Sequence, residues 1–340
     1  MPNTNISDTF PIAVLGAGAW GTALAILLAR NGRQTILWSW EADHTRALRE
    51  DRCNKRFLPD YPFPPLLSIA ANLTDALSSA RDILIAVPSC AFREVLKSAV
   101  PMLATTRRIS WATKGFELGT GRLLHHVAAD IVGSDTPMAV LSGPTFAAEV
   151  AAELPTAMTV ASTDDSFARD LSKSLHSQRF RVYTSSDIVG VQICGGVKNI
   201  LAIAAGTADG LGFGANARAG LITRGLAELM RLGTALGGKR DTFMGFAGLG
   251  DLVLTCTDDQ SRNRRLGLAL AGGKSLDDAK CGIGQVIEGI DSTRVVVDLA
   301  RRHGVEMPIA EQVYKVLFEH APPLDAVNAL LARSARPETL

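Results

Sequence analysis

The sequence predicts an α/β protein in two parts, a Rossmann-like doubly wound sheet followed by an all-α C-terminal domain. Short apolar runs typical of buried strands alternate with helical segments up to about residue 186. The first strand and helix enclose a glycine pattern, and beyond residue 187 the strand-like runs stop. We therefore place the domains at residues 1–186 and 187–340, and expect a ligand cleft between them.

The first segment is predicted to be a strand, a glycine-rich turn and a helix. Pro11–Leu15 is a short apolar run, the pattern G-A-G-A-W-G follows at once, and Thr22–Arg30 has helical character. In this setting Gly16 permits the tight turn, Gly18 lets a pyrophosphate approach the backbone, and Gly21 lets helix and strand pack closely. The helix N-terminus adds aligned N–H groups for phosphates. The pattern therefore favours dinucleotide binding over a purely structural turn.

The end of the second predicted strand, Gln34–Trp38, should distinguish NAD from NADP. An acid there binds the ribose 2′-hydroxyl, whereas an arginine accommodates a 2′-phosphate. Glu41 fits either the ribose acid or an acidic residue in the first turn of the next helix. Arg46 and Arg49 lie further along that helix, so the sequence leaves NADP and NAD both open.

Further apolar runs extend the predicted sheet. Arg52–Pro65, which lies before them, is rich in proline and is predicted to be an irregular loop at the edge of a site. Ligands of open α/β sheets bind beyond the carboxyl ends of strands. Lys114 follows such a strand and is a candidate anion contact, although a surface lysine is the simpler interpretation. The predicted strands are Asp82–Val87, Arg108–Ala112, Met138–Leu141, Thr156–Ala161 and Phe180–Thr184.

The second predicted domain begins with an apolar helix that contains one lysine, Lys198, just after Gly195 and Gly196. Burial of an ammonium group lowers its pKa by up to roughly 3–5 units. Such a lysine can exchange a proton near neutral pH, as carbonyl reduction requires. The alternative is a lysine that reaches solvent along its alkyl chain.

The next segments supply a carboxylate. Gly206–Gly220 is predicted to be a glycine-rich connection, and Leu221–Leu236 a helix. Asp251 follows several glycines and precedes an apolar run. It suits a helix cap, or a group that binds substrate or orients Lys198.

A basic helix start comes next. Ser261, Arg262 and Asn263 precede the predicted helix Arg264–Leu270. Hydroxyl, guanidinium and amide groups at a helix N-terminus suit a phosphate, and a solvated basic turn is the alternative. Gly282–Gly289 is predicted to be a second glycine-rich turn. The remaining predicted helices are Ser292–His303, Ile309–Phe318 and Asp325–Ala332.

Composition excludes several classes of protein. A formal net charge of +1 gives no overall field that attracts nucleic acid or an anionic membrane. The five cysteines are scattered, which argues against disulfides and zinc and favours a reducing cytoplasm. Met1–Phe10 is polar and lacks the basic start of a signal peptide. Ile12–Ala29 is apolar, but it is interrupted by glycines and short for a membrane span.

Eight short motifs also stand in a fixed order along the chain. They are Gly16-Ala-Gly-Ala-Trp-Gly21, Asn54-Lys-Arg-Phe-Leu-Pro59, Val87-Pro-Ser89, Thr113-Lys-Gly115, Ser142-Gly-Pro-Thr-Phe-Ala147, Gly195-Gly-Val-Lys-Asn199, Gly248-Leu-Gly-Asp251 and Ser261-Arg-Asn-Arg264. In this order they resemble the bacterial NAD(P)-dependent glycerol-3-phosphate dehydrogenases, over about residues 11–330.

The resemblance implies reversible reduction of dihydroxyacetone phosphate to sn-glycerol 3-phosphate for phospholipid synthesis, with Lys198 as the acid/base. The implied substrate contacts are Lys114, Gly143, Thr145, Lys198, Asp251, Ser261, Arg262 and Asn263. The implied cofactor contacts are Gly16, Gly18, Ala19, Trp20, Gly21, Trp40, Lys114, Ala147, Arg262, Val286 and Glu288. We expect NADP or NAD and no metal. We expect neither nucleic acid nor integral membrane contact, and relatives often form homodimers.

Two departures and two alternatives remain. Trp40 stands where relatives often have a basic residue, and Phe57 stands where many have tyrosine. One alternative is a β-hydroxyacid dehydrogenase or ketopantoate-reductase-like enzyme, which would need a carboxylate site in place of the basic helix start. The other is a non-catalytic dinucleotide-binding sensor, which would need the glycines but not Lys198.

Overall fold

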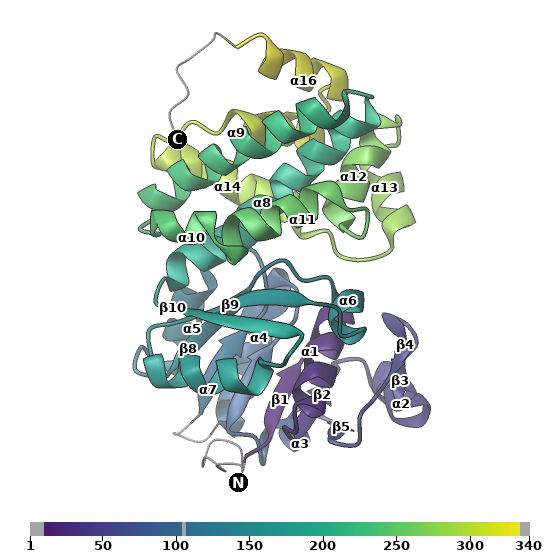
Figure 1. The fold of residues 1–340 in the computed structure, drawn as a ribbon, viewed down its shortest axis with the longest axis vertical. Helices are drawn as coiled ribbons and strands as arrows, with labels where there is room; N and C mark the ends of the chain where they lie inside the picture. Colours follow the sequence, from purple (N-terminus) through teal and green to yellow (C-terminus); the bar gives the residue numbers. More distant parts are fainter. Residues whose placement is uncertain (1–9, 104–106, 334–340) are drawn as a thin grey trace. The chain divides into compact units, whose positions relative to one another are not determined.

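The computed structural model describes residues 10–103 and 107–333, which form two compact units. The first unit contains the described residues up to Thr113 together with Leu124–Ile188, and the second contains Lys114–Leu123 together with the residues from Val189 (Figure 1). The chain thus enters the second unit for ten residues, returns, and enters it again. Most of the polar opening, from which we predict no targeting segment, lies outside the described residues.

The first unit is built on one large sheet. Within the described residues it has eight strands in the order β10-β9-β8-β7-β6-β1-β2-β5. Neighbours are parallel except β8 and β9, so β9 and β10 run opposite to the rest. All seven strands predicted from the sequence are confirmed, and β5 is an additional one. The strands are β1 (Ile12–Leu15), β2 (Thr35–Trp38), β5 (Leu67–Ile69), β6 (Asp82–Ile85), β7 (Arg108–Trp111), β8 (Met138–Ser142), β9 (Thr156–Ser162) and β10 (Phe180–Ser185).

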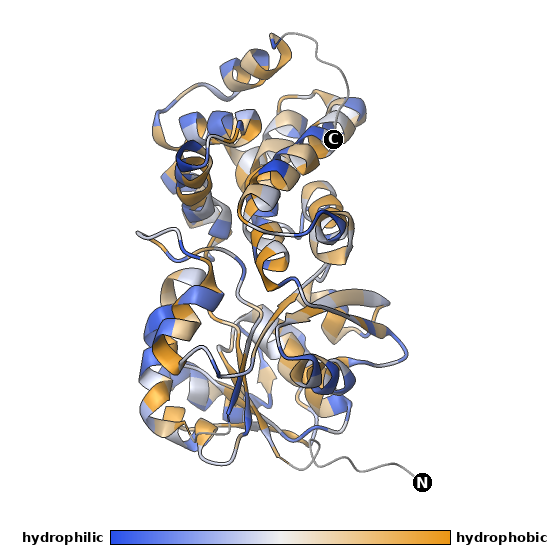
Figure 2. Ribbon diagram, turned by 90° about the vertical axis from the view of Figure 1, so that its left-hand side faces the viewer, coloured by the Kyte–Doolittle hydropathy of each residue, from blue (hydrophilic) through white to orange (hydrophobic). Residues whose placement is uncertain are grey.

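Helices enclose this sheet. Hydrophobic residues colour the strands at its centre in Figure 2, and β1, β6 and β7 are buried along their whole length. Runs of this kind are typical of parallel strands covered on both faces. The helices of the first unit are α1 (Ala19–Arg30), α2 (Ala42–Asp51), α3 (Leu73–Leu77), α4 (Ser89–Ala99), the short η2 (Val100–Met102), α5 (Leu124–Val132), α6 (Ala147–Ala151) and α7 (Asp165–Leu175).

The prediction of an irregular loop across residues 52–65 is wrong. Strand β3 (Cys53–Asn54) pairs antiparallel with β4 (Leu58–Pro62) in a small separate sheet. Both strands are edges, where proline is tolerated. The buried Asn54 amide donates to the Ala17 carbonyl at 2.9 Å and to Thr22 Oγ1 at 2.7 Å. The hairpin is therefore fastened to the turn between β1 and α1.

The second unit is helical around α8. Helix α8 is long and apolar enough to cross a membrane, but 94% of its most apolar window is buried inside the protein, as expected of a core helix. The helices are α8 (Ile188–Gly210), α9 (Gly214–Ala235), α10 (Arg240–Met244), the π-helical turn η3 (Phe246–Gly250), α11 (Asp251–Thr257), α12 (Arg262–Ala271), α13 (Leu276–Ile283), α14 (Glu288–Arg302), α15 (Pro308–Phe318) and α16 (Pro323–Leu331).

The predicted connection over 206–220 is also wrong, because α8 and α9 occupy nearly all of it. Glycine here permits close packing of helices. A Cβ at Gly206 would lie 2.1 Å from the Arg264 carbonyl oxygen, and one at Gly267 would lie 2.1 Å from the Ile203 carbonyl oxygen. The backbones of α8 and α12 therefore approach each other through these two glycines.

Replacing Gly206 with alanine should lower the free energy of unfolding by about 1–3 kcal/mol, because the methyl group overpacks the contact with α12. Gly282 is the matched control: it lies in α13, and a Cβ there would meet no atom within 4 Å. Gly282→Ala should be neutral or slightly stabilising. Urea unfolding of both variants measures the difference, and equal midpoints would contradict this account of Gly206.

Candidate active site

The turn between β1 and α1 has the geometry of a phosphate cradle. Gly16 has a φ of +117°, and a Cβ on it would lie 2.8 Å from the Ala86 carbonyl oxygen. A Cβ on Gly21 would lie 1.9 Å from the Gly16 carbonyl oxygen, so both positions require glycine. Gly18 is different, because a Cβ there would meet nothing within 4 Å. Open space beside Gly18 and an α1 N-terminus without a capping side chain fit a dinucleotide pyrophosphate.

The same unit has several buried side-chain polar atoms without a hydrogen-bond partner among the described residues, and two of them lie at or beside predicted ligand contacts. These two are Trp20 Nε1, in the first turn of α1, and Ser142 Oγ, at the end of β8. Buried polar groups are normally hydrogen-bonded, so an unsatisfied one requires an explanation. Both lie beside residues predicted to bind ligand, and a bound ligand or water is one such explanation.

The other predicted residues of the first unit follow β2 and β8. Trp40 is 80% exposed. Gly143 is closely packed, since a Cβ there would lie 2.8 Å from Met158 Cα in β9. The Thr145 hydroxyl donates to the Gly143 carbonyl at 3.2 Å, and Ala147 begins α6, which packs against α1. The segment after β8 thus leads into α6, which packs against α1, the helix that follows the glycine turn.

In the second unit, three predicted residues meet in one ion-pair cluster. The buried Lys198 ammonium donates to Asp251 Oδ1, and Lys114 Nζ donates to Asp251 Oδ2 at 2.7 Å. Lys198 also donates to Thr255 Oγ1 at 2.8 Å, and that hydroxyl lies 3.3 Å from Asp251 Oδ1. The two lysines therefore share one carboxylate. The alternative in which Lys198 reaches solvent along its alkyl chain is wrong, because its side chain is buried.

Burial controls the ionisation of Lys198. Desolvation lowers its pKa from the ordinary value to about 7, and the positive charge of Lys114 acts in the same direction. The negative charge of Asp251 opposes both. Near neutral pH, Lys198 can therefore both donate and accept a proton.

Asp251 is not a helix cap. It is the first residue of α11, the N-cap is Gly250, and the Asp251 carboxylate binds the two lysines. The preceding π-helical turn η3 delivers it from the glycine-rich segment. π-helical turns are frequent at functional sites.

The basic start of α12 is tied to neighbouring segments. Ser261 caps the helix by accepting a hydrogen bond from the Arg264 N–H at 3.2 Å. Arg262 Nη1 donates to the Val286 carbonyl at 2.7 Å. Burial lowers the pKa of Arg262, and the charge of Glu288 acts in the opposite direction. The α12 start and the turn before α14 are thus held together, as the predicted shared ligand contacts require.

Asn263 connects this turn to the helix of Lys198. Its amide donates to Asn199 Oδ1 at 2.9 Å, and its own Oδ1 accepts from the Gly289 N–H at 2.9 Å. Asn199 directly follows Lys198. The hydrogen bonds of Asn263 therefore reach the residue next to Lys198 in α8, while the lysine pair itself is held by Asp251.

Sequence reasoning missed Thr255 and Asn199 as members of this cluster. Thr255 is four residues after Asp251 and hence on the same face of α11. Asn199 is the last residue of the motif Gly195-Gly-Val-Lys-Asn199. The spacing of Thr255 from Asp251 is visible in the sequence. It becomes informative only once Lys198 and Asp251 are known to be in contact.

Family models match almost the whole chain. The model described as NAD-dependent glycerol-3-phosphate dehydrogenase N-terminus matches residues 11–168, and the corresponding C-terminus model matches residues 187–328. Glycerol-3-phosphate dehydrogenase [NAD(P)+] from Aeromonas hydrophila is 57% identical over 98% of this chain and 100% of its own length. The relative of the same name from Nitrosococcus oceani is 56% identical over 98% of this chain and 97% of its own.

Solved structures agree with these matches. A crystal structure of glycerol-3-phosphate dehydrogenase from Coxiella burnetii has a TM-score of 0.93 at 53% identity, covering 95% of this chain and 99% of that one. A ketopantoate reductase from Ralstonia eutropha has a TM-score of 0.60 at 17% identity, covering 93% of this chain and 99% of that one. The second likeness shows the fold alone.

Proposed function

Because the chain belongs to the NAD-dependent glycerol-3-phosphate dehydrogenase family, we propose that it catalyses reversible reduction of dihydroxyacetone phosphate to sn-glycerol 3-phosphate. The observation that carries the proposal is the buried Lys198, with a pKa lowered to about 7, held by Asp251 and linked through Asn199 to the basic start of α12. The proposed proton donor, Lys198, and Asn199, which binds the proposed phosphate-binding start of α12, are thus neighbouring residues of α8.

In this mechanism the bound reduced nicotinamide supplies hydride to C2. The Lys198 ammonium donates its proton to the oxygen at C2 as negative charge develops there, and the neutral amine takes a proton from the hydroxyl in the reverse direction. Asp251 and Thr255 hold Nζ in place during both transfers. Because Lys114 also binds Asp251, that carboxylate keeps a cationic partner when Lys198 is neutral.

The proposal assigns cofactor contacts to both units. In the first unit the glycine turn, Ala19, Trp20, Trp40 and Ala147 would bind NAD(P). Lys114, Arg262, Val286 and Glu288 would contribute from the second, and Gly143 and Thr145 would contact the substrate. The open space beside Gly18 supports this assignment.

Replacing Arg262 with alanine should raise the KM for dihydroxyacetone phosphate about 10- to 100-fold, because a charge-assisted hydrogen bond contributes about 1.5–3 kcal/mol. Arg265 is a matched control, as an exposed arginine of the same helix. Steady-state kinetics of both variants should show the increase for Arg262→Ala alone. An unchanged KM would move the phosphate site away from α12.

The reaction itself is tested by the loss of NADPH absorbance, and separately of NADH absorbance, when dihydroxyacetone phosphate is added to the purified protein. Oxidation that depends on this substrate supports the proposal. If a folded protein binds both cofactors but oxidises neither, the function is wrong, and oxidation with small 2-oxo acids instead would favour the hydroxyacid class.

The proposal extends to surroundings and assembly. We place the enzyme in the cytoplasm, where it would supply the backbone of phospholipids. No cysteine of the described residues is in a disulfide, which fits a reducing compartment. We also propose a homodimer. Leu331 in α16 is 67% exposed and lines a pocket of about 1380 Å³ together with residues of α9 and α15, and this is the surface on which a second copy would pack. Light scattering after size-exclusion chromatography measures the mass, and a monomer would contradict this part.

A further inference from the structure

Glu41 stands at the position that reads the cofactor ribose in Rossmann-like folds. It lies just beyond the end of β2, about twenty residues after the glycine turn, where the acid of this fold binds the 2′-hydroxyl. The sequence allowed a second role, as an acid that stabilises the start of α2. Glu41 is the N-cap residue of α2, but its side chain makes no capping hydrogen bond. Its carboxylate is directed elsewhere.

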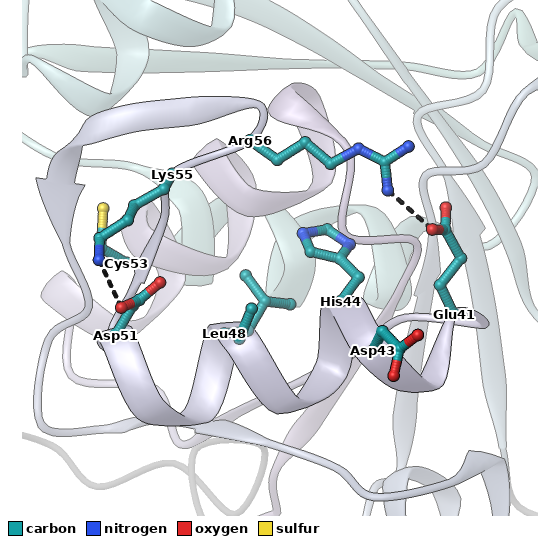
Figure 3. Close-up of a pocket in the computed structure, with 9 residues that line it drawn as sticks. Glu41, Asp43, His44, Leu48, Asp51, Cys53, Lys55 and Arg56 are labelled. Carbon is teal, nitrogen blue, oxygen red and sulfur yellow. Dashed lines mark hydrogen bonds and ion pairs between the residues drawn. The ribbon is translucent and has the colours of Figure 1, made fainter.

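The partner of that carboxylate is Arg56, from the hairpin that the sequence did not predict. Arg56 Nη1 donates to Glu41 Oε2 at 2.7 Å (Figure 3). The guanidinium carbon of Arg56 lies 4.8 Å from the centre of the Phe57 ring. A guanidinium that lies over an aromatic ring is attracted to its face, which favours this placement of Arg56. The arginine that favours a 2′-phosphate is therefore present, but it comes from a different segment than Arg46 and Arg49.

A buried chain of hydrogen bonds holds the hairpin that carries Arg56. His44 Nε2 lies 3.1 Å from Asn54 Oδ1, and its Nδ1 lies 3.3 Å from Ser39 Oγ. Asn54 in turn binds the glycine turn. This chain connects the end of β2, helix α2 and the hairpin, and it holds the hairpin backbone that carries Arg56 against the glycine turn.

Both members of the pair are accessible. The Arg56 side chain is 55% exposed and the Glu41 side chain 36% exposed, and both line a pocket of about 210 Å³ (Figure 3). The other charged groups that line it are Asp43, Asp51 and Lys55, of which the last two pair with each other at 2.5 Å. Exposed ion pairs stabilise a protein little, so a ligand can separate Glu41 from Arg56 easily.

We propose that Glu41 and Arg56 together read the 2′ position of the adenosine ribose and accept both cofactors. This inference rests on the use of NAD(P) in the proposed function. Glu41 accepts a hydrogen bond from the 2′-hydroxyl of NAD while it keeps its pair with Arg56. The 2′-phosphate of NADP repels Glu41 and replaces it as the anionic partner of Arg56. Arg56 thus supplies the cation that position 40, occupied by tryptophan, does not.

The pair can be tested without catalysis by isothermal titration of the full-length protein with two adenosine fragments, 5′-AMP and adenosine 2′,5′-bisphosphate. Arg56→Gln should weaken bisphosphate binding about tenfold or more and change AMP binding little, because only the bisphosphate has an anion at the 2′ position. Glu41→Gln should strengthen bisphosphate binding several-fold and weaken AMP binding, because it removes both a repulsion and an acceptor.

Lys55→Gln is the matched control, since it removes a neighbouring cation of the same hairpin that is paired with Asp51. It should change the ratio of the two affinities less than about twofold, because exposed charges are screened. The inference is overturned if Lys55→Gln acts like Arg56→Gln, if both fragments respond equally to each variant, or if neither responds.

Kinetics then separate this inference from the proposed function. The ratio of the KM values for NADH and NADPH should fall in Arg56→Gln and rise in Glu41→Gln, relative to the unaltered enzyme. If the unaltered enzyme oxidises both cofactors with dihydroxyacetone phosphate but this ratio does not move, the reading of the pair fails and the function stands. If no oxidation occurs although the fragments respond as expected, the function fails and the reading stands.

Discussion

Lys198→Ala is expected to lower turnover about 10²–10⁴-fold, the usual contribution of a positioned general acid. Binding of the dinucleotide should persist, since Asp251 retains Lys114 as a partner and no buried carboxylate is left alone. Steady-state turnover measures the loss, and titration with NADPH measures binding.

Chemical rescue makes this test specific. Small alkylamines added to Lys198→Ala should restore part of the turnover, because the truncation leaves room beside Asp251 and Thr255 for an ammonium group. The same amines should not stimulate the unaltered enzyme. Turnover near the normal level in Lys198→Ala would refute the assignment of the acid/base.

Asp251→Asn should reduce turnover and also shift its pH dependence. In the unaltered enzyme, reduction needs the Lys198 ammonium, so the rate falls as pH rises through about 7, and oxidation falls as pH drops through about 7. The charge of Asp251 raises the pKa of Lys198. Its removal lowers that pKa further, and each unit lost should reduce the rate of reduction above the pKa about tenfold.

The measurement is the pH profile of kcat in both directions, with Asp259→Asn as the control. Asp259 is also an aspartate paired with a cation, Arg264 at 2.8 Å, but it is mostly exposed. Only Asp251→Asn should move the midpoint to lower pH. A profile that loses height without moving would mean that Asp251 positions substrate and does not set the pKa of Lys198.

The sequence was sufficient where one physical cause dominates a segment. Apolar runs predicted all seven strands, and the signal is clearest in parallel strands that are buried along their whole length, such as β1 and β6. The glycine turn was also predictable, because Gly16 and Gly21 occupy positions that have no space for a side chain. The apolar helix around Lys198 indicated burial but left open a lysine that reaches solvent along its alkyl chain, and the structure shows that Lys198 is buried.

It was insufficient where a residue type has two uses. Gly206 lies in a glycine-rich stretch that is typical of a turn. The residue that explains it, Arg264 in α12, is distant in sequence, so the helix contact could not be predicted. The hairpin at residues 52–65 is rich in proline and yet forms strands, because its fixed point is a buried asparagine bound to the glycine turn. Arg56 was not predicted as a cofactor contact because it lies in this hairpin, which the sequence predicted to be an irregular loop.

The excursion of Lys114–Leu123 means that the helical unit is not a separable module. Phe116 is buried in this segment, and a Cβ on Gly196 would lie 2.4 Å from its ring, so the segment packs directly on the helix of Lys198. During synthesis these ten residues leave the ribosome before α8, the helix on which Phe116 packs. A gene fragment that starts at residue 187 would lack both Phe116 and Lys114. Recombination between relatives should therefore exchange residues 114–123 together with the helical unit, as one inherited block.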